Sequence, residues 1–171
     1  MRKKTNAEQL KNYLEVIAGW GLRSFEGYVL HNGKAYTDIH SGVGKGIPRQ
    51  CFMNAWQMVD ILRPALTYVE GYAVRNGLIP VLHAWTVDVA GTVLDPTWDD
   101  GVAYYGVEFE RELVLRTIIA RGYYGVIDNM QQGYPLVRKW YDDHAEALLK
   151  QPKRKRRTIH VFDFTVEGKF V

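Results

Sequence analysis

Cysteine is nearly absent from this sequence, because the 171 residues contain only one, Cys51. No disulfide can form within the chain, so packing alone must hold the fold, as is usual in a reducing compartment. No segment approaches the roughly 20 consecutive apolar residues that a membrane span requires. Polar residues between Asn6 and Glu15 also interrupt any apolar segment of a signal peptide. These absences predict a cytoplasmic protein that does not enter a membrane.

A general excess of positive charge is missing as well. The chain has 22 Lys and Arg residues against 19 Asp and Glu residues, and its net charge is +3. Five of the basic residues form a single run: Lys153, Arg154, Lys155, Arg156 and Arg157. Without them, 17 basic residues face 19 acidic ones, a balance of −2. This balance argues against nucleic acid as the ligand of the whole domain. The run itself is interpreted as a solvated loop, a nucleic-acid contact or a localisation signal.

Sequence patterns for nucleotides and metals are also lacking. The segment 44–46 has neither the first glycine of a phosphate-binding loop nor the Ser or Thr that follows its lysine. Paired acids occur at 99–100 and 142–143, but adjacent residues on a helix do not face each other. They are therefore interpreted as solvated turn acids rather than as a catalytic carboxylate pair. No Cys-x-x-Cys or His-Glu-x-x-His spacing occurs among the five histidines, His31, His40, His83, His144 and His160. We therefore expect neither a cofactor nor a bound metal.

Length and patterning predict a single α+β domain over residues 1–171. A hydrophobic content of 47% in a chain of this length can bury a substantial core. Apolar spacing predicts helices over 6–20, 49–62, 107–121 and 134–150, and strands over 68–74 and 158–166. Asn6 and Gln9 resemble a capping box for the first helix. The pair Asn32-Gly33 suits a type I′ turn, which predicts a hairpin over 24–39.

The segment 81–98 predicts a second hairpin. Its two apolar runs flank Asp88-Val89-Ala90-Gly91, which can form a type I turn with the glycine in the left-handed conformation. In that register Asp88 pairs with Thr92, and Trp85 lies opposite Asp95. His83 is two residues from Trp85 and faces the same side of the strand. The Asp95 carboxylate can therefore hold the His83 ring by a hydrogen bond.

Cys51 lies in the first turns of the helix predicted over 49–62. A thiol there is close to the positive end of the helix dipole, which favours the thiolate and suits a nucleophile. The expected buried face of this helix comprises Cys51, Asn54, Ala55, Met58, Val59 and Leu62.

Taken singly, each of these three residues has a simpler interpretation. Cys51 can be a small core residue, His83 a hydrogen-bonded core histidine and Asp95 a turn carboxylate before Pro96. Together they are the parts that a nucleophile, a base and an orienting group require. The combination favours a catalytic site over three separate structural roles.

The segment from Gly46 to Trp98 resembles the core of the transglutaminase-like superfamily of cysteine enzymes. The resemblance rests on Cys51 at the start of an apolar helix, on His83-Ala84-Trp85, and on Asp95-Pro96-Thr97-Trp98. It implies a papain-like fold in which the helix carrying the cysteine packs on an antiparallel sheet. It also implies Cys51 as nucleophile, His83 as general base and acid, and Asp95 as the residue that orients His83.

The activity implied by this resemblance is attack on an amide or peptide bond of a protein or peptide substrate, through a thioester. Hydrolysis would make the chain a protease, amidase or deamidase, whereas transfer to an amine would make it a transglutaminase-type acyltransferase. A non-catalytic protein-binding module of the same fold is the alternative. Substrate choice is expected to lie in the loop 41–49 and in the chain beyond Trp98. Four residues are candidates for the second oxyanion donor: Trp20, Gln50, Trp56 and Trp98.

Overall fold

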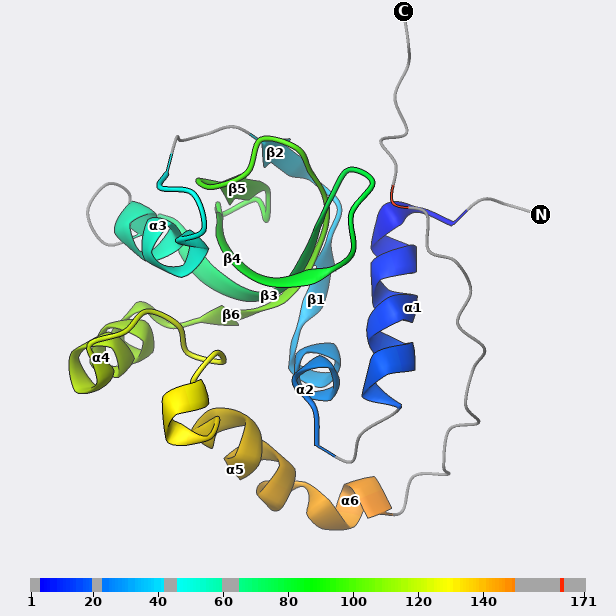
Figure 1. Ribbon diagram of the computed structural model, residues 1–171, viewed down its shortest axis with the longest axis vertical. Coiled ribbons are helices and arrows are strands. Elements are labelled where there is room, and N and C mark those ends of the chain that lie inside the picture. Colours follow the sequence, from blue (N-terminus) through cyan, green and yellow to red (C-terminus); the bar gives the residue numbers. More distant parts are fainter. Residues whose placement is uncertain (1–3, 20–22, 42–45, 60–64, 150–163, 165–171) are drawn as a thin grey trace, which may run out of the picture.

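The computed structural model describes residues 4–19, 23–41, 46–59, 65–149 and 164, which form an α+β fold around a six-stranded sheet (Figure 1). The strands follow the order β1-β6-β3-β4-β5-β2. Neighbours are antiparallel except β2 and β5, which are parallel. The strands are β1 (Lys34–Tyr36), β2 (Ile39–Ser41), β3 (Thr67–Arg75), β4 (Val81–Val87), β5 (Val93–Asp95) and β6 (Gly101–Phe109). The α+β prediction is confirmed, as is the strand predicted over 68–74.

The sheet is strongly curled, and its two faces bury separate apolar clusters (Figure 1). Side chains alternate along a strand, so Tyr68 and Val74 of β3 face the helices while Val69 and Ala73 point into the curl. The inner cluster comprises Tyr36, Val69, Ala73, Trp85, Val87, Val93 and Tyr104. The helices α1 (Asn6–Ala18), α2 (Phe25–Asn32) and α3 (Cys51–Gln57) lie around the outside of the curled sheet (Figure 1).

Two glycines allow close packing inside the curl. Gly71 of β3 lies opposite Gly106 of β6, and both lie on the inner face of the sheet. A Cβ atom at Gly106 would lie only 2.6 Å from the Trp85 ring. At Gly71 a Cβ atom would lie 2.2 Å from the carbonyl oxygen of Tyr105. Since no side chain fits at either position, Gly71 allows β6 to approach β3 closely, and Gly106 allows the large Trp85 ring to pack beside the pair of residues described below.

Helix α1 (Asn6–Ala18) confirms the first predicted helix, but its cap lies one residue earlier than expected. Thr5 is the N-cap residue and accepts a hydrogen bond from Glu8 N, while the Glu8 carboxylate accepts one from Thr5 N. The capping box therefore joins Thr5 and Glu8 rather than Asn6 and Gln9. Leu10 and Leu14 of this helix are fully buried against the sheet.

The hairpin predicted over 24–39 is wrong, because most of this segment forms helix α2 (Phe25–Asn32) followed by β1. Ser24 caps the helix by accepting a hydrogen bond from Gly27 N at 3.0 Å. Gly33 has a φ of −104°, whereas a type I′ turn needs positive φ at both central residues. Burial of Tyr28 and Val29 in the core stabilises the helix over the turn that Asn32-Gly33 would favour.

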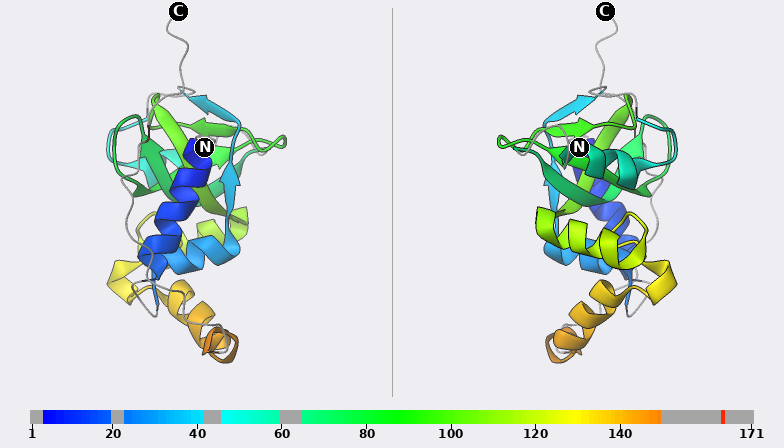
Figure 2. Two further views of the ribbon diagram at one scale, coloured as in Figure 1. Left: turned by 90° about the vertical axis from the view of Figure 1, so that its right-hand side faces the viewer. Right: turned by 90° about the vertical axis from the view of Figure 1, so that its left-hand side faces the viewer.

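Beyond residue 100 the predicted helices are partly right. The helix predicted from Val107 begins only at Arg111 as α4 (Arg111–Arg121), because 101–109 form β6, which was not predicted. The helix predicted over 134–150 is divided at His144 into α5 (Pro135–Asp143) and α6 (Ala145–Leu149). A short 3-10 helix, η2 (Met130–Gln132), precedes α5. Figure 2 shows α5 and α6 at one end of the molecule, away from the curled sheet.

Two predicted features lie mainly outside the described residues: the basic run 153–157 and the strand over 158–166. Phe164 is described; it is buried, and its carbonyl oxygen accepts a hydrogen bond from Gly77 N. Among the helices that the structure describes, none has the length and apolar character needed to cross a membrane.

Candidate active site

The hairpin of β4 and β5 has the predicted turn and register. Thr86 pairs with Leu94 and Val87 with Val93, which places Trp85 opposite Asp95 when the register is continued. The turn is closed by a hydrogen bond from Gly91 N to Asp88 O at 2.9 Å, with Gly91 at φ +85°. This local geometry brings His83 and Asp95 to the same face of the hairpin.

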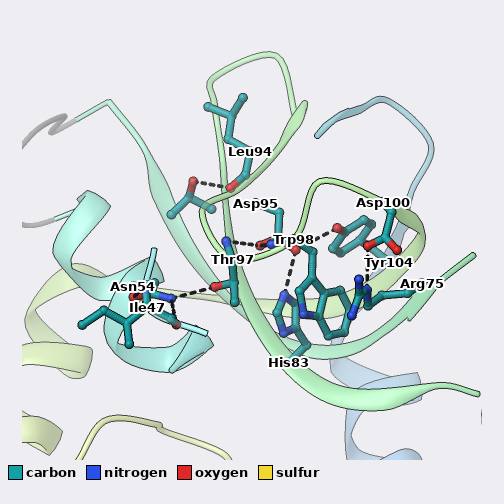
Figure 3. A network of polar contacts seen from close by, with 11 residues as sticks. Ile47, Asn54, Arg75, His83, Leu94, Asp95, Thr97, Trp98, Asp100 and Tyr104 are labelled. Atoms are coloured by element: carbon teal, nitrogen blue, oxygen red, sulfur yellow. Dashed lines mark hydrogen bonds and ion pairs between the residues drawn. The ribbon is translucent and has the colours of Figure 1, made fainter. Parts of the chain in front are cut away.

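His83 and Asp95 form a buried hydrogen-bonded pair. His83 Nε2 lies 2.7 Å from Asp95 Oδ2, and the two side chains are 1% and 0% exposed (Figure 3). The carboxylate has three further donors: the Tyr104 hydroxyl at 2.8 Å, Thr97 N at 2.7 Å and Trp98 N at 3.0 Å. With every donor in place, Asp95 has one orientation and holds the imidazole ring in one orientation as well.

Trp98 covers one face of the His83 ring. The two rings stack with centroids 3.7 Å apart and an angle of 10° between their planes. The Arg75 guanidinium lies 5.8 Å from the centroid of Trp98, and Arg75 Nε donates to Asp100 at 2.6 Å. Trp98 is thus fixed from the side of β3 and shields the imidazole from water (Figure 3).

The electrostatics of the pair favour a charged imidazolium facing a carboxylate. Burial by itself lowers the pKa of His83, but the hydrogen bonds to Asp95 and Cys51 and the charges of these groups raise this pKa from 6.5 to about 9. Burial raises the pKa of Asp95, but the contacts with His83, Thr97 and Trp98 outweigh burial and lower the pKa below its usual value.

The stability of the fold should depend on this pair in a defined pH window. A rise in the His83 pKa from 6.5 to about 9 corresponds to roughly 3 kcal/mol of folding free energy, shared among its partners. Since the folded pKa is the higher one, this contribution is complete below pH 6.5 and is lost as the pH rises towards 9. We expect the difference in unfolding free energy between the parent and Asp95→Asn proteins to be largest near pH 6 and to become smaller towards pH 9.5, where the loss of the bonds from Thr97, Trp98 and Tyr104 remains.

Urea denaturation at both pH values measures this difference. The control is Asp99→Asn, which removes an exposed neighbouring acid. A difference between parent and Asp95→Asn that is the same at pH 6 and pH 9.5 would contradict the charged pair.

Helix α3 (Cys51–Gln57) carries the cysteine at its first residue, so the helix begins two residues later than predicted. Of its expected buried face, Asn54, Ala55, Met58 and Val59 are buried and Cys51 is half-buried, while Leu62 lies outside the described residues. A side-chain interaction with Cys51 and the charge of Cys51 contribute to the raised pKa of His83, so the two side chains lie near each other. Because Nε2 of His83 is engaged by Asp95, Nδ1 is the ring nitrogen left for Cys51. The structure therefore brings all three predicted residues together.

Asn54 joins the cysteine helix to the loop before it and to the turn that follows Asp95. Its amide nitrogen donates to Ile47 O at 2.8 Å and to Thr97 Oγ1 at 3.0 Å, and its oxygen accepts from Ile47 N at 3.1 Å (Figure 3). The backbone at Arg49, two residues before Cys51, has a φ of +66°, a strained conformation of the kind found at functional sites. Cys51 is thus held on a fixed backbone.

Sequence reasoning missed two residues of this site. Asn54 was expected only as one member of a buried face, although a polar residue on an otherwise apolar face signals a need for hydrogen-bond partners. Tyr104 left no signal, because it comes from β6, which was not predicted.

The candidates for an oxyanion donor differ in position. Trp56 is buried in the core, and Trp98 stacks on His83. Gln50 is exposed directly before Cys51, and Trp20 lies outside the described residues. In the part of the chain that the structure describes, no three His, Cys, Asp or Glu side chains are grouped so that they could hold a metal ion.

No family model matches the chain, and neither does any curated protein or solved structure. The interpretation of the site therefore depends on its own geometry and on the motifs quoted above.

Proposed function

We propose that this protein is a cysteine-dependent acyl-transfer enzyme of the transglutaminase-like, papain-like type, acting on amide or peptide bonds. The observation that carries the proposal is the buried pair of His83 and Asp95, whose Nε2 and Oδ2 atoms are 2.7 Å apart, near Cys51 at the first residue of α3. A nucleophile, a base and an orienting carboxylate are what such chemistry requires.

In the first step the Cys51 sulfur attacks the carbonyl carbon of the substrate. A carbon–sulfur bond forms, and the electron pair of the carbonyl π bond moves to oxygen, where the backbone N–H of Cys51, unpaired within the helix, can stabilise the charge. When this intermediate collapses, the carbon–nitrogen bond breaks. The departing nitrogen takes the proton of His83 Nδ1 and leaves as an amine or ammonia, so that a thioester and neutral His83 remain.

In the second step water or an amine attacks the thioester carbon. His83 Nδ1 accepts the proton of the attacking group, and the carbon–sulfur bond breaks to return Cys51 as a thiolate beside an imidazolium. Water yields an acid, whereas an amine yields a new amide. Asp95 stays ionised throughout and orients His83. Because the thiol must stay reduced, we also propose a reducing compartment such as the cytoplasm.

A test is to trap the thioester. Incubation with p-nitrophenyl acetate followed by intact mass spectrometry should show one acetyl group per chain that hydroxylamine removes, and peptide mapping should place this group on Cys51. The Cys51→Ala protein should lack this labile adduct. An adduct at Cys51 that forms no faster than on free cysteine under the same conditions would instead support the non-catalytic binding module.

A further inference from the structure

The loop after α4 packs against the first turn of the cysteine helix. Helix α4 ends at Gly122, which has a φ of +65°, and the chain then turns back through Gly125, with a φ of +117°. A Cβ atom at Gly125 would lie 3.5 Å from the ring of Phe52, the residue after Cys51. The backbone of this loop therefore lies close to α3 next to the proposed nucleophile, with little room for a side chain between them.

The buried Glu70 side chain on β3 holds the backbone of this loop at residues 126–128. Its carboxylate, 0% exposed, accepts hydrogen bonds from the N–H groups of Val126, Ile127 and Asp128 and from the hydroxyl of Tyr68. Arg121 donates to the carbonyl oxygens of Gly125 and Asp128 from the other side. A loop held by so many bonds to its backbone presents its side chains in defined positions.

Tyr123 is the aromatic side chain that this loop presents to solvent. It is 42% exposed, and the Arg121 guanidinium lies 5.9 Å from the centroid of its ring. Tyr123 lies two residues before Gly125, whose backbone approaches Phe52, the residue after Cys51, so the loop presents Tyr123 near the start of α3. A large exposed ring on a fixed loop beside a reactive sulfur is suited to hold a ligand.

We propose that Tyr123 is a substrate-positioning residue that packs against an apolar or aromatic side chain next to the reacting carbonyl of the acyl donor. The inference rests on the proposed function, because it places this side chain relative to a carbonyl bound at Cys51. Ile47 is 53% exposed, and its backbone is bonded to Asn54 one turn after Cys51, so it adds apolar surface near the same helix. The substrate class is accordingly a peptide with a hydrophobic residue at the modified amide.

Two chloromethyl ketones with the same reactive group test this inference. Acetyl-phenylalanyl and acetyl-glycyl chloromethyl ketone both alkylate a thiolate with loss of chloride, and they differ only in the side chain. For each protein, the rate ratio of the phenylalanyl compound to the glycyl compound is divided by the same ratio for free cysteine. The parent should give a normalised ratio of about ten. Tyr123→Ala should lose this preference, Tyr123→Phe should keep it, and all three proteins should react equally with iodoacetamide.

Val89→Ala is the control, because Val89 is an exposed apolar residue at the tip of the β4–β5 hairpin. It should keep the parent's preference. A parent without the preference, or a Tyr123→Ala protein that keeps it, would overturn the role of Tyr123 while leaving the proposed function intact. Failure of the proposed function would give a different result: iodoacetamide would react with the parent no faster than with a free thiol.

Discussion

At pH 6.5, iodoacetamide should alkylate Cys51 in the parent protein faster than in His83→Ala, by a factor on the order of ten to a hundred. The pKa of His83 is raised to about 9, so the ring stays protonated at this pH and its positive charge favours the thiolate next to it. Removing the ring removes that charge. The measurement is the alkylation rate from pH 5 to pH 10 for both proteins, with thermal melts to establish that each is folded.

Asp95→Asn is the second variant of this experiment. It keeps nearly the same volume but removes the charge that helps to hold the proton on His83, so its profile should lie between those of the parent and His83→Ala. Three superimposed profiles with midpoints near pH 8.5, the usual value for a free thiol, would mean that Cys51 is an ordinary core cysteine.

Replacing Glu70 by Gln should cost about 2–4 kcal/mol of unfolding free energy. The fully buried carboxylate accepts hydrogen bonds from three backbone N–H groups and one hydroxyl. The amide that replaces it has one accepting oxygen, and its NH₂ group would face donors that need an acceptor. Urea denaturation with an unchanged m-value would measure the loss.

Glu108→Gln is the matched control. Glu108 lies on β6, pairs with Lys34 at 2.6 Å and accepts a hydrogen bond from the Tyr36 hydroxyl, which the oxygen of Gln can also accept; its side chain is substantially exposed. Such a pair contributes little, so the control should lose less than about 1 kcal/mol. Equal losses in the two variants would show that Glu70 does not anchor the loop over 126–128.

The proposed catalytic pair could be predicted from sequence because it is local. His83 and Asp95 are 12 residues apart on one hairpin, and the turn at Asp88–Gly91 determines the register that brings them together. The contact with Cys51 depends on how α3 packs on the sheet, and it was expected from the motifs of the resemblance. Tyr104 and the anchoring of the loop by Glu70 depend on the long-range pairing of β3 with β6, which no local pattern indicated.

The hairpin wrongly predicted over 24–39 and the helix predicted to start at Val107 have a common cause. Asn32-Gly33 favours a tight turn by its local preferences, but Ser24 caps a helix whose residues Tyr28 and Val29 are buried in the core. Around Val107 the apolar residues fit a helix, yet Val107 and Phe109 continue a strand paired with β3. In both segments tertiary packing overrides the local signal, and that packing depends on residues far away in the chain.

The burial of His83 and Asp95 limits proton exchange of the imidazole to one of its two nitrogen atoms. Trp98 covers one face of the imidazole, and Asp95 occupies Nε2, so Nδ1 on the side of Cys51 is the position from which the ring proton exchanges. In the mechanism proposed above, a substrate bound at the sulfur would cover this position before the carbon–nitrogen bond breaks. The Nδ1 proton would then pass to the departing nitrogen rather than to bulk water.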